Sequence, residues 1–239
     1  SELPDNWRAT VYQMEIASPT AAAMVLPVPV DTRDYDPDNP DAADIIDFID
    51  LSDYRQIFDD MERSFPQADR PRGISKSYRS PLPTVPVGDY VASFVPNYEA
   101  FERLDPLFRL SPTAVTAMQR AADYRHCGFA VFQLRDIATP TQIQPMAYTY
   151  CTNRPRQLFF PTLHLHDGHD VPEQAEFDHQ LYMQQSQHFD TGWKVGTHEG
   201  ALAVNLRASN GLLRRGRRLL RGTFYGKFPN RDTIIEAVL

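Results

Sequence analysis

The sequence predicts an α+β fold that is mainly antiparallel β, with a sandwich- or barrel-like sheet core and two or three helices in the N-terminal half. Three observations predict it. Short apolar or alternating segments, typical of strands, recur along the whole chain. The segments beyond residue 125 follow one another closely, which favours an antiparallel meander. Helical spacing of apolar residues appears only before that point.

The first strands are predicted from alternation and from apolar runs. Residues 10–16 alternate between apolar and polar side chains, which indicates a strand. Residues 22–30 form an apolar run that Pro27 and Pro29 interrupt, so we expect this strand at a sheet edge or with a bulge. Residues 44–51 predict the next strand.

A helix, a long loop and two shorter segments follow. Apolar residues in 53–65 have the spacing of an amphipathic helix. The stretch at about 66–88 is rich in Pro, Arg and Ser and predicts a long surface loop. We expect a strand at 90–95 and a short helix at 98–104. A further helix should begin after Ser111, because a serine cap followed by proline suits a helix start.

The second half of the chain predicts strands with short connections. Their residues are 128–135, 143–152, 157–166, 175–185, 201–206 and 219–228, and residues 233–238 should form a short helix or strand. With no internal repeat or low-complexity tract, we expect one globular domain over residues 1–239.

Composition limits the classes of protein. Apolar residues make up 42% and charged residues 23%, values that are ordinary for a soluble globular chain. No apolar run approaches the length of a membrane helix, and the first residues lack the pattern of a signal peptide, so a cytoplasmic location and no membrane partner are expected. Cys127 and Cys151 do not make a disulfide framework, and two free thiols are the simpler interpretation.

Charge is distributed unevenly along the chain. Residues 31–62 hold twelve acidic residues, whereas residues 207–231 hold eight basic residues and no acidic one. The net charge of −7 makes nucleic acid an unlikely partner. We therefore expect the Arg-rich part to face the acidic part, within one chain or across a homo-oligomer.

Histidines gather late in the chain. Five of the seven lie between residues 164 and 188, and a sixth is His198. Imidazole is the commonest metal ligand among side chains and titrates near neutral pH. His164, His166 and His169 fall within six residues, so this segment is where the sequence most strongly indicates chemistry.

Two predicted strands bring these histidines toward carboxylates. Alternation places His164 and His166 on one face of their strand, and places Glu176 and Asp178 on the polar face of the next strand. If the two strands pair as a hairpin, His166 lies opposite Glu176 and His164 opposite Asp178, with Cβ atoms about 4.5–5.5 Å apart. His179 falls on the apolar face and is interpreted as a core histidine.

Two imidazoles and a carboxylate suit a divalent metal, zinc first and iron second. The candidate metal ligands are His164, His166, His169 and His198. The candidate catalytic carboxylates, as a third ligand or a general base, are Glu176 and Asp178. The same residues also fit ordinary cross-strand pairs worth about 0.2–1 kcal/mol each.

Two functions of different classes follow from these patterns. The first is a metal-binding protein, for example a metal-dependent hydrolase or oxygenase that acts on a small molecule. The second is a non-catalytic interaction or self-assembly protein that uses the acidic surface (31–62) and the Arg-rich surface (207–231) to contact a protein partner or another copy. Whether the chain is an enzyme is left open by the sequence, which contains no GxSxG, P-loop or GxGxxG motif.

Overall fold

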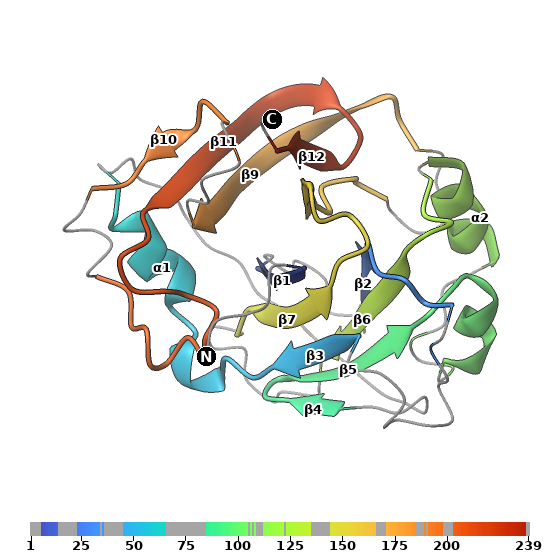
Figure 1. The fold of residues 1–239 in the computed structure, drawn as a ribbon. Coiled ribbons are helices and arrows are strands. Elements are labelled where there is room, and N and C mark those ends of the chain that lie inside the picture. Colours follow the sequence, from blue (N-terminus) through green and yellow to red (C-terminus); the bar gives the residue numbers. More distant parts are fainter. Residues whose placement is uncertain are drawn as a thin grey trace.

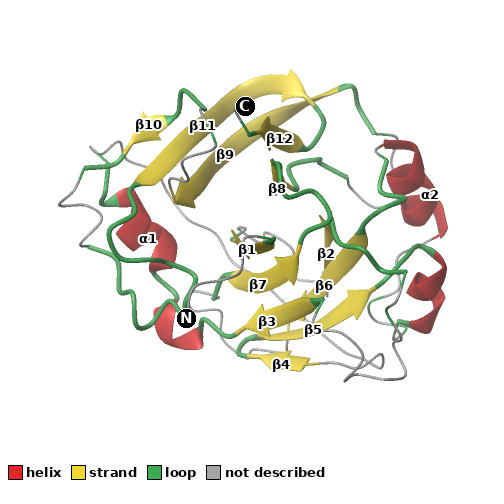
Figure 2. Cartoon of the chain, viewed as in Figure 1, coloured by secondary structure: helices red, strands yellow, loops and turns green. Residues whose placement is uncertain are grey.

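The computed structural model shows a chain built mostly from antiparallel strands (Figures 1 and 2). It describes residues 6–13, 23–33, 35, 45–65, 85–104, 106, 108, 112–121, 123–134, 144–165, 171–184, 189, 191–197 and 203–237. Among these, both α-helices are short and fall in the N-terminal half, as the sequence predicts. None of the helices in these ranges has the length and apolar character needed to cross a membrane.

The elements have the following bounds. The strands are β1 (Trp7–Tyr12), β2 (Ala23–Val28), β3 (Ile46–Ile49), β4 (Val85–Val87), β5 (Tyr90–Val95), β6 (Gly128–Leu134), β7 (Met146–Cys151), β8 (Gln157–Phe160), β9 (Gln174–Gln184), β10 (Lys194–Val195), β11 (Leu219–Pro229) and β12 (Thr233–Glu236). The helices are η1 (Ser52–Tyr54), α1 (Ile57–Glu62), η2 (Glu99–Arg103) and α2 (Pro112–Ala121).

The described strands form four sheets, with the orders β2-β6-β5-β4, β1-β7-β3, β10-β11-β9 and β12-β8. They do not close into a barrel. The predicted meander is wrong, because β6, β7, β8 and β9 do not pair with one another: β6 pairs with β2 and β5, β7 with β1 and β3, β8 with β12, and β9 with β11. The reason lies in β6, an apolar run that is buried along its whole length and therefore takes a central place between strands from the N-terminal part.

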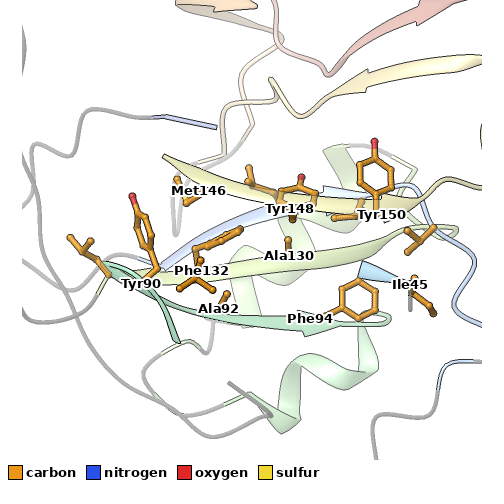
Figure 3. Close-up of a cluster of buried hydrophobic side chains, with 14 residues drawn as sticks. Ile45, Tyr90, Ala92, Phe94, Ala130, Phe132, Met146, Tyr148 and Tyr150 are labelled. Carbon is orange, nitrogen blue, oxygen red and sulfur yellow. The ribbon is translucent and has the colours of Figure 1, made fainter. Parts of the chain in front are cut away.

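The sheets containing β6 and β7 pack face to face. Phe132 of β6 lies 6.1 Å from Tyr148 of β7 between ring centroids, and Phe48 of β3 meets Phe132 edge-on at 5.4 Å. Figure 3 shows the side chains of this cluster between the two sheets. A fully buried Phe or Leu contributes about 1.5–3 kcal/mol, so this interface is a major part of the core.

Helices cover the outer faces of these two sheets. Phe129 and Val131, on the other face of β6, pack with residues of η2 and α2 such as Phe101 and Met118. The outer face of β7 contributes Ala147 to a cluster with α1. In Figure 2 the two α-helices accordingly lie at opposite sides of the sheets.

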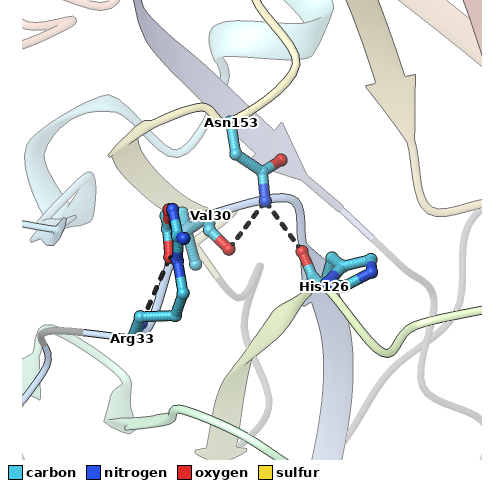
Figure 4. Close-up of polar contacts among 5 residues, drawn as sticks. Val30, Arg33, His126 and Asn153 are labelled. Atoms are coloured by element: carbon cyan, nitrogen blue, oxygen red, sulfur yellow. Dashed lines mark hydrogen bonds and ion pairs between the residues drawn. The ribbon is translucent and has the colours of Figure 1, made fainter.

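A single side chain ties three segments together at one end of the sheets. Asn153, just after β7, donates from Nδ2 to the carbonyl oxygens of Val30 and His126, each at 2.9 Å (Figure 4). These carbonyls belong to the segment after β2 and to the turn before β6. Asn153 therefore fixes the connections that flank the central strand.

β9 and β11 form a long, curved antiparallel ribbon, and the short β10 pairs with the other edge of β11 (Figure 1). At one end, Leu220 and Met183 pack with Trp193 and with residues of the β8–β12 pair. Gly222 of β11 lies directly under the Trp193 ring, and a Cβ there would come within 2.4 Å of it. Glycine at this position is therefore required for the close packing of Trp193.

Several predicted boundaries differ from the structure. The helix expected over 53–65 is split into η1 and α1, because Tyr54 turns inward, where its hydroxyl donates to Asp60 Oδ2. The strand expected at 157–166 ends at Phe160. Within 201–206, the described residues 203–206 form bends and a turn rather than a strand. β2 lies at the edge of its sheet, as its prolines predict.

We predict that Gly222→Ala lowers the free energy of unfolding by about 1–3 kcal/mol, the usual cost of overpacking a filled core. Urea denaturation followed by tryptophan fluorescence measures it, and a changed native emission would report the displaced Trp193 ring. Thr223→Ser, at the exposed neighbouring position, should shift stability by less than about 0.5 kcal/mol. Equal stability of the two variants would contradict the packing argument.

We also predict that the two thiols react at very different rates. Both cysteines are free, and burial raises the pKa of the Cys127 thiol to about 11, so about one in a thousand is a thiolate at pH 8. Cys151 is only half-buried. Ellman's reagent at pH 8 should modify one thiol per native chain, and Cys151→Ser should abolish that phase while Cys127→Ser keeps it.

Candidate functional site

The structure brings His164 and His179 together, a pair that sequence reasoning did not join. His164 lies in the extended segment after β8, and His179 lies near the middle of β9. Their Nε2 atoms are 3.3 Å apart, and the ring centroids are 4.9 Å apart in an edge-on arrangement. The pair therefore joins the ribbon to the segment that follows β8.

The backbone of His164 is held by the chain that connects β11 and β12. Asn230 Oδ1 accepts a hydrogen bond from the His164 N–H at 2.8 Å, and Asn230 Nδ2 donates to the His164 carbonyl at 2.9 Å. Asp232 Oδ1 accepts from the Leu163 N–H at 3.0 Å. These side chains make the backbone hydrogen bonds that a neighbouring strand would otherwise make to this segment. They therefore fix the position of the His164 backbone, from which the imidazole ring extends.

Aromatic rings enclose the imidazole pair. Phe177, two residues before His179 on the same face of β9, is stacked on His164 at 4.6 Å with an interplanar angle of 19°. Phe177 also meets His179 edge-on at 5.2 Å, and on its other side it contacts Phe228 of β11. The pair consequently lies in a partly dry environment, where electrostatic interactions are stronger than in water.

This environment keeps His179 neutral. Burial lowers the pKa of His179, and the neighbouring His164 lowers it further. The His179 Nδ1 atom is buried and has no hydrogen-bond partner among the described residues. Because an unpaired buried N–H costs more than an unpaired nitrogen lone pair, the ring proton belongs on Nε2, where it faces His164 Nε2.

The predicted hairpin of imidazoles and carboxylates is wrong. β9 pairs with β11 rather than with β8, so Glu176 lies opposite Lys227 and Asp178 opposite Tyr225. Both carboxylates are exposed on the face of β9 that points away from His179. Their catalytic role stays a prediction that this geometry does not support.

The other predicted ligands cannot be placed. His166, His169 and His198 lie outside the described residues. Within the described ranges, no group of three or more His, Cys, Asp or Glu side chains is arranged to hold a metal ion. The candidate site therefore consists of the His164–His179 pair.

Among the described residues, an ion pair joins the acidic and Arg-rich parts of the chain. Arg221 of β11 donates to both carboxylate oxygens of Glu62 at the end of α1, at 2.6 Å to Oε2, and lies over the Phe65 ring. Tyr182 donates to the same carboxylate at 2.6 Å. Part of the charge complementarity seen in the sequence is thus satisfied within one chain.

Sequence reasoning missed two features of this site. Alternation correctly placed His179 and Phe177 on one face of β9, but it gave no indication that His164 would reach that face. The role of Asn230 had no signal in the sequence beyond the turn-forming pair Pro229-Asn230. Both depend on the pairing of distant strands.

Comparisons with known proteins do not assign the site. No protein-family model matches the chain, and no curated protein matches it. Among solved structures, the chain is similar to a mutated baculovirus P35 after caspase cleavage, with a TM-score of 0.48 and 10% sequence identity over 99% of this chain and 95% of that one. Similarity at this level supports no conclusion about the site or the function of this chain.

We predict that Asn230→Ala lowers the free energy of unfolding by about 1–3 kcal/mol, because the N–H and the carbonyl of His164 lose their partners together. Asn230→Asp keeps an acceptor for the N–H and loses only the donor, so its loss should be smaller. Urea denaturation of the three proteins gives the order. An alanine variant as stable as the parent would show that Asn230 does not hold the segment.

Proposed function

We propose that this chain binds a divalent metal ion through Nε2 of His164 and Nε2 of His179. The observation that carries the proposal is their separation of 3.3 Å. In a tetrahedral zinc site with Zn–N distances of about 2.0–2.1 Å, two ligand nitrogens lie about 3.3–3.4 Å apart. The two imidazoles already have the spacing that one ion requires.

The surroundings favour a metal ligand pair in two further ways. A histidine ligand must be neutral, and burial together with His164 lowers the pKa of His179. His164 is held in two ways. Asn230 hydrogen-bonds its backbone, and the Phe177 ring stacks on its imidazole ring. A fixed ring loses little entropy when an ion binds, so the pair is preorganised.

The two imidazole donors suit zinc better than iron. Imidazole nitrogen binds Zn²⁺, Cu²⁺ and Ni²⁺ well, whereas the iron arrangement of two histidines also needs a carboxylate on the same side. Glu176 and Asp178 point away from the pair, so iron is less favoured. Water molecules would complete the zinc shell, and a zinc-bound water is also what hydrolysis requires. Hydrolase or oxygenase activity stays a prediction.

The competing interpretation is a hydrogen bond between two neutral imidazoles. In that state the proton on His179 Nε2 must leave before an ion can bind, and it then occupies the unpaired, buried Nδ1 at a cost of about 1–3 kcal/mol. Four-ligand structural zinc sites bind with about 10–16 kcal/mol. We expect this two-histidine site to reach about half of that, a Kd of about 1–200 µM.

The proposal predicts that protein without a His-tag binds one zinc ion per chain and that His164→Gln and His179→Gln each weaken binding at least tenfold. Calorimetric titration with ZnCl₂ measures affinity and stoichiometry. At ten times the Kd, free zinc should stabilise the parent by about 1.4 kcal/mol. Removal of zinc with a chelator should reverse the shift.

His126→Gln is the matched control, because His126 is an exposed imidazole distant in sequence from the pair, and it should bind zinc as the parent does. Long-range ¹H–¹⁵N spectra of the imidazole rings separate the two interpretations, since coordination shifts both Nε2 resonances. Unchanged zinc binding in both glutamine variants, or zinc-independent Nε2 resonances, would leave the pair as a hydrogen bond.

A further inference from the structure

Three segments that are far apart in sequence meet beside Gly88. Gly88 lies in the turn between β4 and β5, Asp50 directly follows β3, and Gln144 lies just before β7. Gly88 has φ of +55°, a conformation that favours glycine. The Gln144 side chain also fills the place where a Cβ of residue 88 would stand. Glycine therefore allows the Gln144 amide to lie against this turn.

The Gln144 side chain is buried, and its oxygen is not satisfied. Gln144 is 1% exposed, and its Nε2 donates to the Val87 carbonyl at 2.9 Å. Its Oε1 makes no hydrogen bond with the described residues. A buried amide oxygen without a partner is destabilising, so a partner from outside the chain would be favourable.

The buried oxygen of Gln144 faces a second oxygen. Asp50 Oδ1 lies 2.7 Å from the position that a Cβ of Gly88 would occupy, and Gln144 Oε1 lies closer still to the same position. The Asp50 carboxylate is held in place, because its Oδ1 accepts from the Ser52 N–H at 2.7 Å. A carboxylate and an amide oxygen are both acceptors, so neither can donate to the other.

Rotation of the Gln144 amide does not remove this conflict. If Nε2 and Oε1 exchanged places, Nε2 would donate to Asp50, but Oε1 would then face the carbonyl oxygen of Val87. With Nε2 bound to Val87, the space between Gln144 Oε1 and Asp50 Oδ1 suits a positive group. A cation there would satisfy both oxygens at once.

The charges around this space favour a cation. Asp89 accepts from Arg55 Nη2 at 2.9 Å and from the Gln144 N–H at 3.0 Å, so Arg55 and Asp89 neutralise each other. The Asp50 carboxylate is part of the stretch 31–62, which holds twelve acidic residues. A surface rich in one sign of charge raises the local concentration of the opposite ion.

We propose that Asp50 Oδ1 and Gln144 Oε1 bind a calcium ion between them, with water completing the shell. Calcium takes carboxylate, amide and water oxygens at 2.3–2.6 Å, so two oxygens on one ion lie within about 5 Å of each other. Magnesium demands near-ideal octahedral geometry and loses water reluctantly, so it suits the site less. With a single carboxylate among the ligands, we expect a Kd of about 0.1–1 mM. The site is separate from the zinc proposal, because it uses oxygen donors from other elements.

Terbium luminescence tests the site on the full chain after treatment with a chelator. Tb³⁺ replaces Ca²⁺ and is sensitised by a nearby tyrosine, and the Tyr90 hydroxyl donates to the Gln144 carbonyl at 2.9 Å. CaCl₂ should displace the sensitised emission. Asp50→Asn keeps an acceptor for the Ser52 N–H but loses the charge, so it should weaken calcium binding at least tenfold. Asp47→Asn, at an exposed aspartate of β3, is the matched control and should change binding less than twofold.

Gln144→Glu tests the second ligand in the opposite direction. It places a carboxylate beside that of Asp50, so without calcium the repulsion should lower the melting temperature by about 2–4 °C. Calcium should reverse most of this loss and should bind at least threefold more tightly than to the parent, because the site gains a charged ligand. Circular dichroism without calcium shows that each variant folds.

Any of three results would overturn the proposal. Asp50→Asn with the calcium affinity of the parent would exclude this carboxylate as a ligand. An equal loss in Asp47→Asn would show a general attraction of cations to the acidic surface. A parent chain with neither sensitised emission nor a thermal shift at ten times the expected Kd would leave the two oxygens to an ordered water. His179→Gln should bind calcium as the parent does, so failure of the zinc site and failure of this one are distinguishable.

Discussion

The complete burial of β6 is the constraint on which the rest of the structure depends. Phe129, Val131 and Phe132 are at most 1% exposed, although they point to opposite faces of the strand. Each buried aromatic or branched side chain contributes about 1.5–3 kcal/mol, so both faces must be covered. The sheet of β7 covers one face, and η2 and α2 cover the other. As a result, β6 and β7 do not pair with each other, although their order in sequence suggests a meander.

Because β6 and β7 pair with strands from the N-terminal part of the chain, β8 and β9 pair elsewhere, and this determines the candidate site. β8 is left to pair with β12, and β9 is left to pair with β11. The connection from β11 to β12 then passes beside the segment after β8, where Asn230 binds the backbone of His164. His164 consequently approaches β9 from the face of Phe177 and His179, and never faces the carboxylates of the opposite face.

The ribbon of β9 and β11 positions two different parts of the chain. The inner face of β9 is aromatic and partly dry, which lowers the pKa of His179 and favours its neutral form. The end of β9 fixes the segment before β11, because Gln184 bonds both the N–H and the carbonyl of Arg214.

Local periodicity determined much of the secondary structure. It gave the bounds of β5, the start of α2 at Pro112, the edge position of β2 and the two faces of β9, since side-chain alternation and proline chemistry act within a few residues. Strand partners were decided only by tertiary structure, because pairs such as Trp7 with Cys151 depend on which apolar faces pack against each other in the folded chain. The sequence singled out His164 as a candidate ligand, whereas the fold alone supplied His179 as its neighbour.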